Sequence, residues 1–175
     1  MPADEESALV ERLVNAKDPD AFRQLYSKHT PVLYSIAIRL SGNTADAEDF
    51  VHDTWLRAVT GLRGYRGGSS LRTWLVGVLI NRTRESFRAR TFASLDQGEA
   101  LEALSHDVPP TAERMDIETA LARMPVRYRE VFVLHDVEGF KHAEIADLLG
   151  IEEGTSRSQL LRGRGWLRNA LGEST

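Results

Sequence analysis

The apolar residues of this chain recur at helical spacing along nearly all of its length. One face of a single predicted helix, for example, carries Leu71, Trp74, Leu75, Val78 and Leu79. No segment alternates with the period of two that is expected of a strand. The pattern predicts an all-α protein with helices over roughly residues 5–16, 19–40, 44–60, 70–90, 112–123 and 126–137, followed by a helix-turn-helix.

Three residues indicate where these helices bend or end. Pro31 has no backbone N–H to donate, so we expect it to kink or divide the second helix. Asn43 precedes the third helix and belongs to the residue types preferred as N-caps. Gly150 follows the first helix of the helix-turn-helix, where a glycine adopts the left-handed conformation at little cost.

The end of the chain, residues 141–164, has the pattern of a helix-turn-helix with a basic second helix. The first helix has an apolar face that stops at Gly150, and the second helix carries Arg157, Arg162 and Arg164. Such a compact pair of helices is typical of proteins that place their second helix in the major groove of DNA.

Composition divides the chain into two parts. Residues 91–113 contain five acids, no lysine or arginine, and the pair Pro109-Pro110, as is typical of a linker. We therefore expect two small helical domains, residues 1–92 and residues 114–175, joined by a flexible linker over residues 93–113.

Charge is distributed unevenly over these parts. The whole chain has a net charge of −4, yet residues 61–92 hold seven arginines and one glutamate, and residues 154–175 hold four arginines and one glutamate. Arginine suits bidentate contact with phosphate and guanine, so both segments are candidates for nucleic-acid binding. A general preference for arginine over lysine would explain the identity of these residues but not their clustering.

Several classes of protein are excluded by what the chain lacks. It has no cysteine, which excludes disulfides and thiolate-bound zinc, and its five histidines lack metal-ligand spacing. It has no phosphate-binding loop, nucleophile motif or convincing carboxylate pair. The N-terminus has no signal-peptide core, and the longest apolar run, residues 74–80, is too short to span a bilayer. We expect a cytoplasmic protein with no catalytic residues, metal, cofactor or membrane insertion.

Strings in both predicted domains carry a family resemblance. In the first domain they are AEDFVHDTWLRAV (residues 47–59), YRGGSSLRTWL (65–75) and INR (80–82); in the second they are MPVRYREVFVLHDVEG (124–139), EIADLLG (144–150) and GTSRS (154–158). In this order the chain resembles the extracytoplasmic-function (ECF) sigma factors, small two-domain members of the sigma-70 family that direct bacterial RNA polymerase to promoters. The resemblance covers about residues 20–90, similar to sigma region 2, and about residues 112–171, similar to sigma region 4.

For the helix-turn-helix, the resemblance implies recognition of the upstream, minus-thirty-five promoter element. The residues that it assigns to this contact are Arg157, Ser158, Gln159, Leu161, Arg162 and Arg164. The alternative is an ordinary solvated helix face. This helix also departs from the family pattern, because Ser156 replaces a usual buried valine, Glu152 replaces a usual serine cap, and Gly163 and Gly165 interrupt the helix. We expect an altered base preference and a looser helix end.

For the first domain, the resemblance implies binding of the downstream, minus-ten element after the duplex opens. The residues that it assigns are Tyr65, Ser69, Ser70, Trp74, Asn81, Arg84 and Arg88. Asn81 matches the asparagine of the base pocket. Core packing is at least as good an explanation for Trp74, and an ordinary polar surface is the alternative for Asn81. Gly77 stands where relatives often have a basic residue, so one contact is expected to be missing.

The third predicted helix resembles the segment that docks on the coiled-coil clamp of the polymerase largest subunit. The assigned residues are Asp49, Asp53 and Trp55. A complement to the helix dipole explains Asp46 and Glu48 equally well, because that benefit is confined to the first turn. The expected partners are therefore core RNA polymerase, promoter DNA and, by family habit, an anti-sigma factor.

Three other functions compete with an alternative sigma factor. A sigma mimic that sequesters an anti-sigma factor would have little use for two positive segments. A dimeric helix-turn-helix repressor would leave the first domain unexplained. A cytoplasmic enzyme has no supporting residues.

Overall fold

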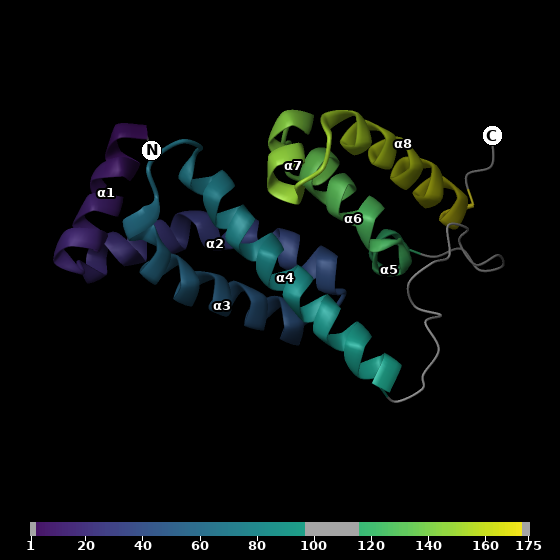
Figure 1. The fold of residues 1–175 in the computed structure, drawn as a ribbon, viewed down its shortest axis with the longest axis horizontal. Coiled ribbons are helices and arrows are strands. Elements are labelled where there is room, and N and C mark those ends of the chain that lie inside the picture. The colour runs from purple at the N-terminus through teal and green to yellow at the C-terminus, as the bar shows by residue number, and fades with distance from the viewer. Residues whose placement is uncertain (1–2, 97–115, 173–175) are drawn as a thin grey trace.

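A computed structural model describes residues 3–96 and 116–172, and within these ranges the secondary structure is helical. The first unit contains α1 (Ala3–Ala16), α2 (Pro19–Ser41), α3 (Thr44–Gly61), η1 (Leu62–Gly64) and α4 (Leu71–Asp96). The second contains α5 (Ile117–Arg123), α6 (Val126–Phe132), the π-helical η2 (Val133–Val137), α7 (His142–Leu149) and α8 (Glu153–Ala170). Figure 1 shows the two groups side by side, and the prediction of an all-α protein is confirmed.

The ends of the helices in the first unit follow local chemistry. Asn43 caps α3 by accepting a 2.8 Å hydrogen bond from the backbone N–H of Asp46, as predicted. Gly42 ends α2 in the left-handed conformation, with φ of 75°. Pro31 lies inside α2, which is continuous over Pro19–Ser41, so of the two expected effects the division of the helix does not occur. α4 continues through Asp96, beyond the predicted end near residue 90.

The second unit is built around the contact between α6 and α8. Its own apolar cluster contains Ala120, Leu121, Met124, Tyr128, Trp166 and Ala170. Gly150 has φ of 65°, as its predicted place after α7 requires. Gly163 allows α8 to approach α6 closely, because a Cβ at this position would lie 3.4 Å from the Cβ and the carbonyl oxygen of Tyr128. α8 is continuous through both of its internal glycines.

The two units pack against each other, a contact that the sequence did not predict. Apolar residues of the second unit join the same buried cluster as those of α2, α3 and α4; they are Val131, Val133, Leu134, Phe140, Ile145, Leu149 and Leu160. Figure 1 shows α7 beside the first half of α4, and α5 and α6 pack against α2. Of the predicted linker 93–113, residues 93–96 belong to α4 and residues 97–113 lie outside the described ranges.

Candidate nucleic-acid and polymerase interfaces

The start of α4 and the loop before it form one side of a cleft. The Ser70 hydroxyl accepts a 3.1 Å hydrogen bond from the N–H of Thr73 and so caps the helix. The cleft has a volume of about 570 Å³ and is lined by Ser69, Ser70, Trp74 and Asn81 among others. Four residues that the sequence assigned to the downstream element therefore meet in one cavity.

Tyr65 extends this group at the edge of the cleft. Its ring lies 5.6 Å from that of Trp74, centroid to centroid, and its hydroxyl donates a 2.6 Å hydrogen bond to the carbonyl of Ser69. Trp74 is half-buried, packs against the core and also lines the cleft, so both explanations offered for it apply. Asn81 is exposed.

The other side of the cleft comes from the second unit and was not predicted. α7 contributes Glu144, Asp147 and Leu148 to its lining. Gly77 lies one turn before Asn81 and faces Leu148, where an added Cβ would sit 3.4 Å from the leucine Cδ2. Helical spacing alone could have placed Gly77 beside Asn81, but the α7 residues depend on how the two units pack.

Arg84 is held by the second unit rather than being free on the surface of α4. Its Nε and Nη2 donate to the two carboxylate oxygens of Glu130 at 2.8 and 2.7 Å, and its Nη1 donates to the carbonyl of Leu149 at 2.9 Å. The hydrogen bonds to Glu130 raise the pKa of the Arg84 guanidinium. Arg88 is exposed and donates a 3.3 Å hydrogen bond to the carbonyl of Arg84.

The candidate recognition helix, α8, presents an open outer face. Leu161 is 68 % exposed, and Arg157, Ser158 and Arg162 are exposed as well. Arg157 pairs with Glu153 one turn earlier, whereas Arg162 has no hydrogen bond or ion pair with any residue that the structure describes. Exposed pairs of this kind are weak, so Arg157 remains available to a stronger partner.

Arg164 and Gln159, which were also predicted to contact the upstream element, differ from Arg157 and Arg162 in their contacts or burial. Arg164 donates to both carboxylate oxygens of Asp136 at 2.7 and 2.6 Å, which ties α8 to η2. The hydrogen bond from Arg164 lowers the pKa of the Asp136 carboxyl. Gln159 is half-buried. In this arrangement, Arg164 supports the position of α8 and is less available to DNA than Arg157 or Arg162.

The inner face of α8 explains one departure from the family pattern. Ser156 is fully buried, and its Oγ lies 2.9 Å from Nδ1 of His142 at the start of α7. The His142 ring stacks on that of His135 at 4.5 Å between centroids. The buried hydroxyl therefore has a partner, which is the usual requirement for a buried polar group. Glu152 makes no side-chain cap to α8.

The acidic face of α3 is partly occupied by arginines of α4. Asp53 accepts a 2.5 Å hydrogen bond from Nε of Arg82, and Asp46 pairs with Arg90 at 2.7 Å. Asp49 is exposed and has no hydrogen bond or ion pair within the described ranges. Of the predicted acids, Asp49 is thus the one whose charge is free for a partner.

Trp55 is not on the surface, which corrects its predicted role as a direct contact. Its side chain is only 4 % exposed, and its Nε1 donates a 3.0 Å hydrogen bond to the hydroxyl of Thr30. Tyr26, Leu56 and Val59 form the exposed apolar surface around it instead, at 41, 58 and 45 % exposure. Leu56 is adjacent to Trp55 and is also apolar, so the sequence did not indicate which of the two faces outward.

Within the described ranges there is no group of three residues suited to hold a metal ion, and no helix is both long and apolar enough to cross a membrane.

Comparison with known proteins connects these surfaces to one family. Residues 25–92 match the family model for sigma-70 region 2, and residues 114–167 match that for sigma-70, region 4. The ECF RNA polymerase sigma factor SigM of Mycobacterium tuberculosis is 33 % identical over 167 residues, which cover 90 % of this chain and 80 % of SigM. SigE of Mycolicibacterium smegmatis is also 33 % identical, over 85 % of this chain and 60 % of SigE. The chain therefore belongs to the sigma-70 family, in its ECF class of RNA polymerase sigma factors.

Solved structures agree with this assignment. The sigma factor RpoE of Bartonella quintana, in a complex with the anti-sigma factor NepR, is 28 % identical, with a TM-score of 0.73 over 88 % of this chain and 98 % of RpoE. CnrH, solved with the cytosolic domain of CnrY, has a TM-score of 0.71 at 23 % identity over 97 % of this chain and 99 % of CnrH, a likeness of fold.

Proposed function

We propose that this chain is an alternative sigma factor, a transcription initiation factor that binds core RNA polymerase and directs it to particular promoters. The observation that carries the proposal is the presence, in one chain, of both sigma regions, each with its own arginine-bearing helix. In this proposal the chain recognises the promoter, and the polymerase catalyses RNA synthesis. The expected location is the cytoplasm, where the polymerase is.

Recognition of the upstream element is assigned to α8. Its exposed side chains combine an apolar group, Leu161, with the unpaired guanidinium of Arg162 and the weakly paired one of Arg157. Guanidinium groups read guanine or hold phosphate, and apolar groups contact the thymine methyl. A helix that offers both in one turn is suited to base readout in the major groove.

Melting of the downstream element is assigned to the cleft at the start of α4. Taking a base out of the stack costs a few kcal/mol, which a pocket and a stacking surface must offset. Asn81 offers hydrogen bonds to the edge of such a base, and the Tyr65–Trp74 pair offers rings for stacking. The positive charge of α4 attracts the strand that carries the base.

Docking on the polymerase is assigned to α3. The free carboxylate of Asp49 and the exposed apolar surface of Tyr26, Leu56 and Val59 provide charge and burial together. Opposite charge on the clamp would speed association and fix register, while the apolar residues would supply most of the affinity. Asp53 contributes through its pair with Arg82, which holds α3 against α4.

An anti-sigma factor is the further partner proposed, because a relative of known structure is bound to one. A sigma mimic is less well supported, since Arg162 and the base cleft would then have no role. A dimeric repressor would require a dimer surface on the second unit, whose buried face is already covered by the first.

The proposal is tested by binding of the labelled chain to purified bacterial core polymerase. Asp49→Arg is expected to weaken binding about tenfold, since a like charge would then face the basic clamp. Glu11→Arg, at an exposed acid on α1, is the matched control and should bind as the parent chain does. Failure of the parent chain to bind core polymerase would reject the proposal, and equal affinity of the two variants would move the dock away from Asp49.

A further inference from the structure

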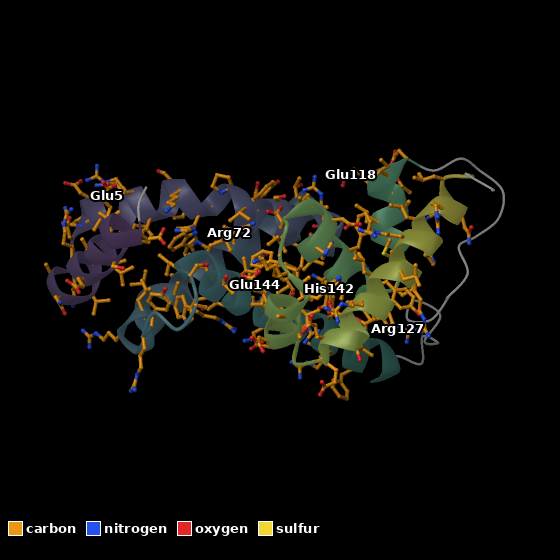
Figure 2. All side chains as sticks on the ribbon, turned by 90° about the horizontal axis from the view of Figure 1, so that it is seen from above. Glu5, Arg72, Glu118, Arg127, His142 and Glu144 are labelled. Atoms are coloured by element: carbon orange, nitrogen blue, oxygen red, sulfur yellow. The ribbon has the colours of Figure 1, made fainter. Side chains whose placement is uncertain are left out.

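At the border between the two units, around the apolar cluster that they share, arginines of the first unit pair with carboxylates of the second. Besides the Arg84–Glu130 pair, Nη2 of Arg72 donates to the carbonyl of Glu138 at 2.9 Å and to its carboxylate at 3.2 Å. The same carboxylate accepts a 2.5 Å hydrogen bond from the hydroxyl of Ser35 on α2. Figure 2 shows Arg72 and Glu144 close to this border. Two arginines of the positive segment of α4 are thus bound by acids of the second unit.

Carboxylate and phosphate groups bind arginine in the same way. Both accept paired, charge-assisted hydrogen bonds from the planar guanidinium, in the geometry that Glu130 shows on Arg84. α7 adds two more acids, Glu144 and Asp147, over the cleft that holds Asn81. The second unit therefore places negative charge next to the face of α4 that is proposed to bind the downstream strand.

The border also buries two charged side chains, Arg129 and Glu130, and their burial makes a permanent contact less favourable. Arg129 is 8 % exposed, its Nη1 donates to the carbonyl of Leu40 at 2.9 Å, and its Nε has no hydrogen-bond partner among the described residues. Burial lowers the pKa of Arg129 to about 10. Glu130 is 3 % exposed. Burying such groups carries a desolvation cost that offsets much of the gain from pairing, so the contact is suited to opening.

The shape of the border depends on small residues. Gly77 leaves room for Leu148, and a Cβ at Gly42 would lie 3.2 Å from the Cβ of Ala122. A larger side chain at position 77 would push α7 away from α4. Gly77, where a DNA contact is expected to be missing relative to the family pattern, thus permits closure at the same place.

We propose that this sigma factor closes on itself, with Glu130 and Glu138 occupying Arg84 and Arg72 in place of DNA phosphates and α7 covering the downstream cleft. The inference rests on the proposed function of α4 in binding the downstream element. In the closed chain, that element is excluded while the outer face of α8 stays exposed. Apparent affinity for the downstream strand is then reduced by the fraction of molecules that are open.

Closure is tested without polymerase or DNA, by energy transfer between two dyes. The chain has no cysteine, so Glu48→Cys on α3 and Arg168→Cys on α8, both exposed, give two unique labelling sites. Transfer efficiency is expected to fall in the double variant Glu130→Gln/Glu138→Gln, which removes the two acids with little change of shape. It should also fall in Gly77→Leu, which acts by size alone, and stay unchanged in the control Glu11→Gln. Unchanged efficiency in both test variants would overturn the proposal.

A second arm measures binding of a single-stranded oligonucleotide carrying the downstream element. If about nine molecules in ten are closed, Glu130→Gln/Glu138→Gln should bind about tenfold more tightly than the parent. Opening without any gain in binding would overturn the claim that closure masks the DNA surface. If neither parent nor variant binds the strand in the presence of core polymerase, the proposed role of α4 fails, while the dye measurement still decides whether the chain closes.

Discussion

The two arginine-bearing helices of this sigma factor differ in what their guanidinium groups contact. On α4, Arg84 and Arg72 are bound by Glu130 and Glu138 of the other unit. On α8, Arg162 is exposed without a partner among the described residues. Arg162 of one positive segment is thus available to a partner, whereas Arg72 and Arg84 of the other are occupied. Net charge along a sequence locates a candidate surface, but its availability depends on the packing of distant elements.

The difference arises from how each helix is held. α8 is fixed from its inner face, by Ser156 on His142 and by the close approach at Gly163, which leaves its outer face free. α4 is buried on the side that faces α2 and α3, and part of its outer face meets α7. Substitutions on the two helices are therefore expected to have different effects.

The largest effect is expected in the core beneath α4. Leu79 is fully buried in the cluster shared by both units, so Leu79→Ala should lower the free energy of unfolding by about 2–5 kcal/mol. Leu161→Ala, on the open face of α8, should change it by less than about 0.5 kcal/mol. Urea denaturation of the full chain measures both. Equal losses would mean that Leu161 is covered in solution.

Removal of the free arginine on α8 should weaken DNA binding next most. Arg162→Ala is expected to cost about 1–3 kcal/mol of binding to the upstream element, since a bidentate contact is lost. Arg168→Ala, at an exposed arginine two residues before the end of the helix, is the comparison and should cost less. Fluorescence anisotropy with promoter duplexes gives both values. Unchanged affinity in Arg162→Ala would remove this residue from the recognition surface.

The cleft on α4 should show its effect only after the duplex opens. Asn81→Ala is expected to leave binding of duplex promoter DNA nearly intact. It should reduce open-complex formation about tenfold, because one base contact worth about 1 kcal/mol or somewhat more is lost. Permanganate reactivity of unpaired thymines in the presence of core polymerase measures this. Normal melting would reject the base pocket at Asn81.

The smallest effect concerns the pH dependence of the support for α8. Burial, and then the nearby charges of His135, Arg157 and Arg164, lower the pKa of His142 below its ordinary value of 6.5. The unfolded chain therefore binds a proton at a higher pH than the folded chain, so this histidine makes the fold less stable as pH falls below 6.5. Nuclear magnetic resonance of the imidazole in the full chain should show titration below 6.5.

Ser156→Ala sharpens this test. The serine hydroxyl can donate to the neutral Nδ1 of His142, so its loss should move the pKa of His142 upward. A titration midpoint above 6.5 in the parent chain, or a downward shift in the variant, would contradict the account.

Much of this molecule follows from local sequence chemistry. The cap at Asn43, the left-handed Gly150 and the helical spacing along α4 depend on neighbours in sequence, and each was predicted. The grouping of Ser69, Ser70, Trp74 and Asn81 in one cleft also follows, because a helix and the loop before it place them together.

What could not be predicted depends on contacts between elements that are far apart in the chain. Burial of Trp55 is set by α2, occupation of Arg84 by α6, and the ion pair of Arg164 by η2. No spacing rule relates these partners, which are 25, 46 and 28 residues apart. The sequence identified the side chains with the right chemistry, and the fold decides which of them face a partner.

We expect this chain to give promoter specificity to bacterial core RNA polymerase. Run-off transcription with purified bacterial core polymerase, on a library of genomic fragments, tests it most directly. The expected result is a set of discrete transcripts that require the chain and that share two sequence elements upstream of their start sites. Transcription that is no different with and without the chain, from a preparation shown to be folded, would contradict it.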